Sequence, residues 1–280
     1  MRAAEHARAD GAPDQAAGLR RLIASRDPGM LAVTGADLAS YAPLALELAA
    51  ASERAGRRVL LLDLTRGALA GRLDRAVRYE LMHVIDAHKR LEEVVIAGPR
   101  DIPWLPAVRG VRALANAWRG ARRFADFVER AGGAPQLVLA VAPAEELEML
   151  AQVAAFATLL VIGQEGGGDL RACYAALKRA HAVRAVAPRV IYAGGLDAEA
   201  ARRAHARLIQ TSRAFLGGEP ELVGRLWARP GAAASREFPS LTLEQLSRAV
   251  ARWPLPQMAA RAASRSAPRV TLRGSVSVSP

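Results

Sequence analysis

The feature that most constrains the fold of this chain is a strand–loop–helix segment near its N-terminus that lacks a lysine. Residues 30–34 are apolar or small and predict a buried strand, and the residues that follow predict a loop leading into a helix. A second apolar strand is expected one helix later, at 59–62. This layout is typical of nucleotide-binding α/β folds, in which loop N–H groups and a lysine hold phosphates. Here the loop keeps one glycine, Gly35, and the two lysines of the chain, Lys89 and Lys178, are distant in sequence.

Short uncharged strands alternate with longer helices along the rest of the chain. Further strands are expected at 102–105, 137–141, 159–162, 189–192 and 222–227. Helices are expected at 40–55, 79–87, 111–130, 145–156, 170–180, 198–215 and 241–253. The alternation predicts an α/β fold with a doubly wound, mostly parallel sheet, helices on both faces and a single domain.

Composition divides the chain into three parts. Residues 1–28 are expected to form a flexible N-terminus that carries a short amphipathic helix at 14–25. The α/β domain is expected over 29–253, and the hydrophobic fraction of 51% is ample for its core. Residues 254–280 are rich in Ser, Arg and Pro and are expected to be disordered.

The formal net charge of +12 does not by itself indicate nucleic-acid binding. Nearly all of the positive charge is arginine spread along an alanine-rich chain, which is typical of solvated helix faces rather than of a DNA-binding groove. The charged N-terminus has no apolar segment of the kind found in signal peptides, and the longest uncharged apolar run is too short to span a membrane. A cytoplasmic protein is expected.

Cysteine and histidine usage indicates neither a disulfide nor a metal centre. The single cysteine, Cys173, lies among helix-forming residues and is interpreted as a small core residue. His83, His88, His181 and His205 do not lie at metal-ligand spacing with carboxylates, so zinc is not expected.

Several segments, in this order, resemble the FlhG (FleN) family of MinD/ParA-like proteins that control flagellar number and placement. The most specific is DQAAGLRRL at 14–22, which is similar to the family's N-terminal DQA-x-x-LR helix. RRVLLLD at 57–63 looks like the family's second strand. YELMHVI at 79–85, LEEVVIAGP at 91–99 and a helix ending in RAFLG at 213–217 are similar to later family segments. The resemblance covers roughly residues 14–250.

The departures from the family pattern concern the nucleotide site. The family loop reads K-G-G-x-G-K-[ST], whereas the present loop has neither lysine and carries Asp37. Ser40 either replaces the Mg²⁺-binding hydroxyl or caps a helix. The family's D-x-D becomes Asp63-Leu64-Thr65, so Asp63 is either a remnant of the water-positioning pair or a turn residue. The Walker B strand at 139–143 has no carboxylate. We therefore interpret Gly35, Ser40 and Asp63 as a vestigial nucleotide site, with no catalytic residue, no metal and no cofactor.

The resemblance implies a function that does not need ATP. In the family, the N-terminal helix inserts into the partner GTPase FlhF, and its glutamine lies beside the reacting water. That role falls here on Gln15, with Asp14, Leu19 and Arg20 as further partner-binding residues; an ordinary helix packed on the domain is the alternative. A flagellar transcriptional regulator or basal-body proteins are further partners implied by the family, at the cell pole or the inner face of the membrane.

Two other functions stay open from the sequence. The first is an active MinD-like ATPase with a divergent phosphate loop, which would use Mg-ATP and dimerise on binding it. The second is a basic ParA-type DNA-associated protein, whose binding would weaken steeply with salt. The helix expected at 241–253 has an apolar face that either packs on the domain or makes a weak membrane contact.

Overall fold

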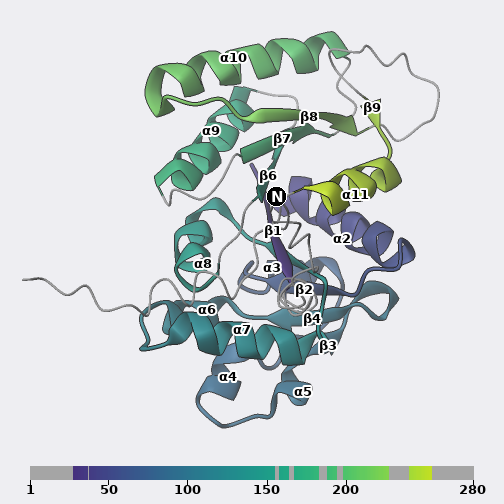
Figure 1. Ribbon diagram of the computed structural model, residues 1–280, viewed down its shortest axis with the longest axis vertical. Helices are drawn as coiled ribbons and strands as arrows, with labels where there is room; N and C mark the ends of the chain where they lie inside the picture. The colour runs from purple at the N-terminus through teal and green to yellow at the C-terminus, as the bar shows by residue number, and fades with distance from the viewer. Residues whose placement is uncertain are drawn as a thin grey trace, which may run out of the picture.

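The computed structural model describes a three-layer α/β arrangement. Figure 1 shows a twisted sheet through the middle of the molecule, with helices on both of its faces. The described residues are 28–36, 38–154, 158–163, 167–182, 188–193, 198–226 and 240–253.

The described residues contribute nine strands to a single sheet. In chain order they are β1 (Gly29–Gly35), β2 (Val59–Asp63), β3 (Ile96–Ala97), β4 (Pro103–Pro106), β5 (Leu137–Val141), β6 (Thr158–Gly163), β7 (Pro188–Tyr192), β8 (Glu221–Leu226) and β9 (Ser240–Leu241). Their order across the sheet is β3-β4-β2-β5-β1-β6-β7-β8-β9. Every neighbouring pair is parallel except β3 with β4. The predicted doubly wound, mostly parallel sheet is confirmed.

The connections between the strands are mostly helical. The helices are α2 (Leu38–Arg54), α3 (Ala68–Arg72), α4 (Leu81–Ile85), α5 (Leu91–Val94), α6 (Val108–Ala115), α7 (Gly120–Ala131), α8 (Leu147–Val153), α9 (Gly167–Ala182), α10 (Ala198–Leu216) and α11 (Leu243–Arg252). Two short 3-10 turns, η1 (Pro99–Asp101) and η2 (Ala144–Glu146), precede β4 and α8.

The sheet separates two hydrophobic cores, because side chains alternate between its faces along each strand. On β1, Leu31 and Val33 face the core that α2, α3 and α11 cover. Met30 and Ala32 face the larger core, which is formed with α4 to α10. All four side chains are fully buried, as expected for a central strand of a sheet covered on both faces.

The helix predicted as one piece at 111–130 is two helices, so that prediction was wrong. α6 ends at Ala115 and α7 begins at Gly120. Arg119 between them has a left-handed backbone with φ of 55°, which no helix interior accommodates. A Cβ on Gly120 would lie 1.7 Å from the carbonyl oxygen of Leu114, so the sharp turn requires glycine there.

Other elements also differ from the predictions. The helix expected at 145–156 is the turn η2 followed by α8, which ends at Val153. α9 begins at Gly167, three residues before the helix expected at 170–180. The strands β3 and β9 and the helices α3 and α5 are additional elements, each five residues long or shorter, and such short segments show no periodic pattern.

The last described helix, α11, packs on the domain. Its Leu246 and Val250 are fully buried in the core that contains α2. The hydroxyl groups of Ser52 on α2 and Ser247 on α11 lie 3.1 Å apart and share a buried hydrogen bond. The apolar face of α11 is therefore occupied by the domain itself. In the described part of the chain, none of the helices is long and apolar enough to cross a membrane.

Candidate functional site

The residues singled out from the sequence lie at the edge of the sheet where the parallel strands end. Gly35 is the last residue of β1 and pairs with Ile162 of β6, while Asp63 is the last residue of β2 and pairs with Val141 of β5. β1 lies between β5 and β6, so the chain continues to one side of β1 through β2 and to the other through β6. In open α/β sheets, ligands bind in the crevice at such a switch point.

The connection between β1 and α2 is short. β1 ends at Gly35 and α2 begins at Leu38, which leaves two residues between them. A phosphate-binding loop of the pattern G-x-x-x-x-G-K-[ST] needs a longer connection and a lysine that reaches the phosphates. Of the two lysines, Lys89 binds Glu93 at 3.0 Å and Lys178 is exposed on α9. The β1–α2 connection is therefore shorter than that loop and contains no lysine.

Ser40 is inside α2 rather than at its N-cap, so the capping role expected for Ser40 was wrong. α2 begins at Leu38, and Ser40 is its third residue. The earlier start also places Pro43 in the second turn, where its missing N–H leaves a carbonyl of the preceding turn without its helical partner. That carbonyl belongs to Ala39, and it accepts a hydrogen bond from Nη2 of Arg72 at 3.4 Å.

Asp63 stabilises the turn that follows β2. Its Oδ1 accepts hydrogen bonds from the backbone N–H of Thr65 at 2.7 Å and from the Thr65 hydroxyl at 2.6 Å. The Thr65 hydroxyl in turn accepts from the N–H of Leu69 at 2.8 Å, near the start of α3. Burial raises the pKa of the Asp63 carboxyl, although the hydrogen bonds from Thr65 act in the opposite direction.

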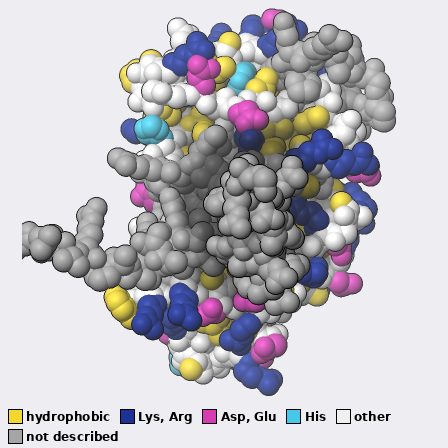
Figure 2. All heavy atoms as spheres, in the orientation of Figure 1, with side chains coloured by type: hydrophobic (Ala, Val, Ile, Leu, Met, Phe, Trp, Pro, Cys, Tyr) yellow, Lys and Arg dark blue, Asp and Glu magenta, His cyan; other side chains and the backbone are white. Residues whose placement is uncertain are grey.

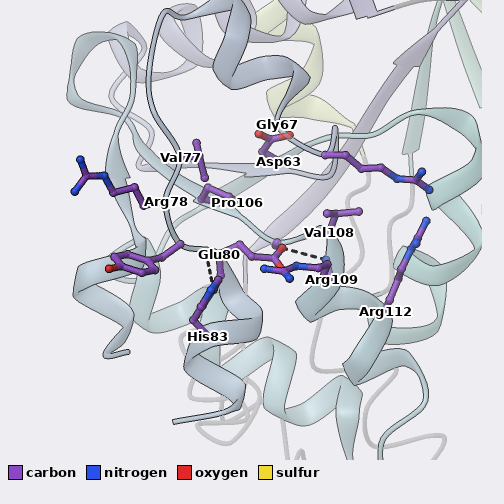
Figure 3. A pocket seen from close by; sticks show the side chains of 13 residues that line it. Asp63, Gly67, Val77, Arg78, Glu80, His83, Pro106, Val108, Arg109 and Arg112 are labelled. Carbon is purple, nitrogen blue, oxygen red and sulfur yellow. Dashed lines mark hydrogen bonds and ion pairs between the residues drawn. The ribbon is translucent and has the colours of Figure 1, made fainter. Parts of the chain in front are cut away.

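A cavity of about 400 Å³ opens beside Asp63, at the carboxyl ends of β2 and β4 (Figure 3). Its lining comes from the turn after β2, from the segment before α4, from α4 and from α6. Four arginines line it: Arg66, Arg78, Arg109 and Arg112. Figure 2 shows basic and acidic side chains interspersed over this lower end of the molecule.

One side of the cavity is held by Glu80, a buried carboxylate immediately before α4. Its Oε1 accepts a hydrogen bond from Nε of Arg109 at 2.5 Å, and its Oε2 accepts from the backbone N–H of Arg109 at 3.0 Å. The backbone N–H of Glu80 donates to Nδ1 of His83 at 3.1 Å. Gly110 lets α6 approach α4 closely, because a Cβ there would lie 2.6 Å from Cβ of Leu81.

On the other side of the cavity, the buried carboxylate of Glu146 binds two of the lining arginines, Arg66 and Arg112. Its side chain is 2% exposed, whereas those of Arg66 and Arg112 are 57% and 45% exposed. Nε and Nη2 of Arg66 donate to Oε1 at 3.1 and 2.7 Å. Nε of Arg112 donates to Oε2 at 3.0 Å, and its Nη2 donates to Oε1. Glu146 thus connects the turns after β2 and β5 to α6.

An apolar wall completes the cavity. Val77, Pro106 and Val108 contribute aliphatic surface to the lining. Tyr79 is 37% exposed, and the ammonium group of Lys89 lies 4.6 Å from the centroid of its ring. In the described part of the chain, no group of three or more Cys, His, Asp and Glu residues is arranged to hold a metal ion.

Of the site residues predicted from the sequence, the structure places Gly35 and Asp63 at the carboxyl ends of β1 and β2, and Ser40 in the first turn of α2. Asp14, Gln15, Leu19 and Arg20, predicted to bind a partner, lie outside the described residues. The sequence reasoning missed the Arg–Glu clusters of the cavity. Arginine is so frequent in this chain that no single one stood out, and Glu146 lies five residues after the end of β5, where the only available signal is a carboxylate close behind a buried strand.

Comparison with solved structures identifies the architecture. The MinD cell division protein of Aquifex aeolicus aligns with a TM-score of 0.55 and 14% identity, over 82% of this chain and 99% of that one. The chain has the MinD/ParA fold. A MinC:MinD complex from the same organism aligns with this fold at a TM-score of 0.51 and 15% identity, over 72% of this chain and 82% of that one.

A putative plasmid partition protein of Borrelia burgdorferi, solved with AMPPNP bound, has the same MinD/ParA fold. It aligns with a TM-score of 0.51 and 8% identity, over 80% of this chain and 97% of that one. The sequence matches no family model and no curated protein.

Proposed function

We propose that this chain is an FlhG-like regulator of flagellar number and placement that does not hydrolyse ATP. It acts by binding an FlhF-type GTPase through the helix at 14–25 and stimulating GTP hydrolysis. Two lines of argument support the proposal: the resemblance of the segments at 14–22, 57–63, 79–85 and 91–99 to the FlhG family, and the MinD/ParA fold.

One observation carries the non-catalytic part of the proposal. Two residues separate Gly35 at the end of β1 from Leu38 at the start of α2, and the connection has no lysine. The surrounding chemistry is consistent with this. Asp63 uses Oδ1 on the turn at Thr65, and Glu146 is occupied by Arg66 and Arg112. Metal-binding and water-positioning groups of a nucleotide hydrolase have no evident counterpart among them.

The partner-stimulating part of the proposal rests on Gln15. A glutamine that orients the attacking water, with arginine charge nearby, accelerates GTP hydrolysis in other GTPase systems. Asp14, Leu19 and Arg20 would hold the helix on the partner, and Arg20 is able to meet phosphate or an acidic surface. Further partners under this proposal are a flagellar transcriptional regulator or basal-body proteins, with the protein in the cytoplasm and transiently at the pole or inner membrane face.

The partner role is tested by GTP turnover of an FlhF-type GTPase with and without this protein. Wild type is expected to raise turnover, and Gln15→Ala is expected to abolish the increase. Gln210→Ala, an exposed residue on α10, is the matched control and should behave as wild type. Equal stimulation by Gln15→Ala and wild type would show that the helix does not act through this side chain.

The competing function is an active MinD-like ATPase that dimerises on ATP. Its support is α2, a helix of 17 residues whose N-terminus follows β1 and offers backbone donors and a favourable dipole to an anion. Calorimetric titration with ATP and ADP, with and without Mg²⁺, separates the two functions. Absence of heat at near-millimolar nucleotide supports the non-catalytic regulator, whereas micromolar binding with ATP-dependent dimerisation supports the ATPase.

A further inference from the structure

The cavity beside Asp63 presents arginine donors that make no hydrogen bond to the described residues. Glu80 binds Nε of Arg109, and both Nη atoms of that guanidinium have no hydrogen bond to a described residue. Glu146 binds the Nε and Nη2 atoms of Arg66 and Arg112, and Nη1 of each has no partner within the described ranges. Glu146 thus holds Arg66 and Arg112 along the Nε–Nη2 edge, and Glu80 holds Arg109 through Nε alone. Each guanidinium keeps donors that no described residue engages.

The two buried glutamates offset only part of the positive charge of the three arginines they bind, and they lie deeper than the guanidinium groups. The side chains of Glu80 and Glu146 are 8% and 2% exposed, so both carboxylates lie behind the guanidinium groups they hold. Asp63 has Oδ1 engaged by Thr65, and burial favours its neutral form. An approaching anion therefore meets guanidinium groups before it meets carboxylates.

The cavity also suits an organic group beside the anion. Its volume of about 400 Å³ lies in the range of sites for small molecules. Val77, Pro106 and Val108 form an aliphatic surface, and the side chain of Tyr79 presents a half-exposed ring. Figure 3 shows Arg109 and Glu80 near the middle of the view and Arg112 to one side, with Arg78 directed away from them.

The cavity shares Asp63 with the predicted vestigial nucleotide site, whereas Gly35 is not among the described residues that line it. The cavity lies at the ends of β2 and β4, and β5 intervenes between β2 and the central strand β1. The elements that shape it are α4, α6 and the turn after β2. The described lining residues all lie at the ends of these strands, in these elements or in the segment before α4, and the binding proposed here does not rest on the proposed regulatory function.

We propose that this cavity binds a small phosphate monoester with an apolar or aromatic substituent. A planar guanidinium donates two parallel hydrogen bonds to phosphate oxygens, and Arg66, Arg109 and Arg112 offer such donors around one cavity. A phosphate monoester carries close to two negative charges at neutral pH and has three terminal oxygens. It therefore suits several guanidinium groups better than a ligand with a single carboxylate would. The substituent lies against the aliphatic surface of Val77, Pro106 and Val108 and the ring of Tyr79.

Titration of the full-length protein with phenyl phosphate tests this site, because the probe combines the phosphate with a flat ring. Saturable binding to wild type is expected, weakened about tenfold or more by Arg109→Ala or Arg112→Ala through loss of a charged hydrogen bond. Arg109→Lys keeps the charge but loses the fork, so it should also bind more weakly than wild type. Arg122→Ala, an exposed arginine on α7, is the matched control and should change affinity less than twofold, as a non-contacting surface charge does.

Inorganic phosphate and Tyr79→Ala separate the two parts of the site. Tyr79→Ala should weaken phenyl phosphate binding and leave inorganic phosphate binding unchanged. Arg109→Ala leaves the buried Glu80 without its ion-pair partner, so this variant could be destabilised. Urea denaturation of each variant confirms folding before titration. If Arg109→Ala does not fold, Arg109→Lys tests the site in its place. Absence of saturable binding to wild type, or equal weakening by Arg122→Ala and the cavity variants, overturns the proposal.

Discussion

Removing both arginine partners of Glu146 would leave a buried negative charge inside the protein. The Glu146 side chain is 2% exposed, and its two oxygens accept four hydrogen bonds from Arg66 and Arg112. Breaking a buried ion pair by deleting one side typically costs about 3–5 kcal/mol, because the remaining charge has neither water nor a partner. We therefore expect the double variant Arg66→Ala/Arg112→Ala to lose about 3–5 kcal/mol of unfolding free energy.

The single variants should cost less, and unequally. Arg112 contacts both oxygens of Glu146, whereas Arg66 contacts Oε1 alone. A hydrogen bond to a charged group contributes about 1.5–3 kcal/mol, so Arg112→Ala should cost roughly 2 kcal/mol and Arg66→Ala somewhat less. The double variant should cost more than the sum of the two, because each arginine compensates partly for loss of the other.

Urea denaturation of wild type, the two single variants and the double variant measures these free energies at one pH. The m-value should stay constant, which shows that the native and unfolded states keep their exposed areas. Glu146→Gln is the complementary variant. It removes the buried charge while leaving two half-exposed arginines that water can solvate, so it should cost less than the double arginine variant. A double variant within about 1 kcal/mol of wild type would refute the reasoning, because it would place Glu146 in contact with water.

Three further predictions concern packing, hydrogen bonding and pH. Gly110→Ala places a Cβ 2.6 Å from Cβ of Leu81, so thermal melting should show a loss of about 1–3 kcal/mol from overpacking. Ser52→Ala should cost about 1–3 kcal/mol by leaving the buried hydroxyl of Ser247 unpaired, whereas Ser52→Ala/Ser247→Ala should be closer to wild type in the same assay. Burial raises the folded-state pKa of Asp63 above its ordinary value of 3.8, so the folded protein holds this proton more tightly than the unfolded chain does. The resulting stabilisation is fully present below pH 3.8 and is lost as the pH rises through the folded-state pKa of Asp63. Urea midpoints of Asp63→Asn should therefore fall less than those of wild type over that rise in pH; parallel profiles would contradict this.

The central strands were predictable because each is an apolar run that can be recognised in the sequence without knowledge of its contacts in the fold. β1, β2, β5, β6 and β7 are short apolar runs bounded by breaking residues, and the structure places them within one or two residues of the predicted bounds. The break between α6 and α7 was not predictable in this way. Apolar residues continue at helical spacing across it, and the left-handed backbone of Arg119 and the tight contact at Gly120 exist only in the folded chain.

The candidate site also combines residues that the sequence indicated with residues that only the fold brings together. Asp63 was identified from the resemblance of residues 63–65 to the family's D-x-D motif, directly after the strand expected at 59–62. The structure makes it the last residue of β2. A turn role for Asp63 was one of two alternatives, and its hydrogen bonds from Thr65 show that it stabilises the turn. Glu80 and Arg109 are 29 residues apart and Arg66 and Glu146 are 80 apart, so no local pattern relates them.

The sequence by itself determined the α/β class, the parallel sheet and the absence of a lysine from the loop after the first strand, because periodicity and residue identity are local properties. Only the tertiary structure decided that α11 buries its apolar face on α2, and that α2 begins two residues after β1 ends. The same holds for the arginine-lined cavity at the ends of β2 and β4. Long-range contacts define these features, and which carboxylate is buried behind which arginine depends on how the strands are ordered in the sheet.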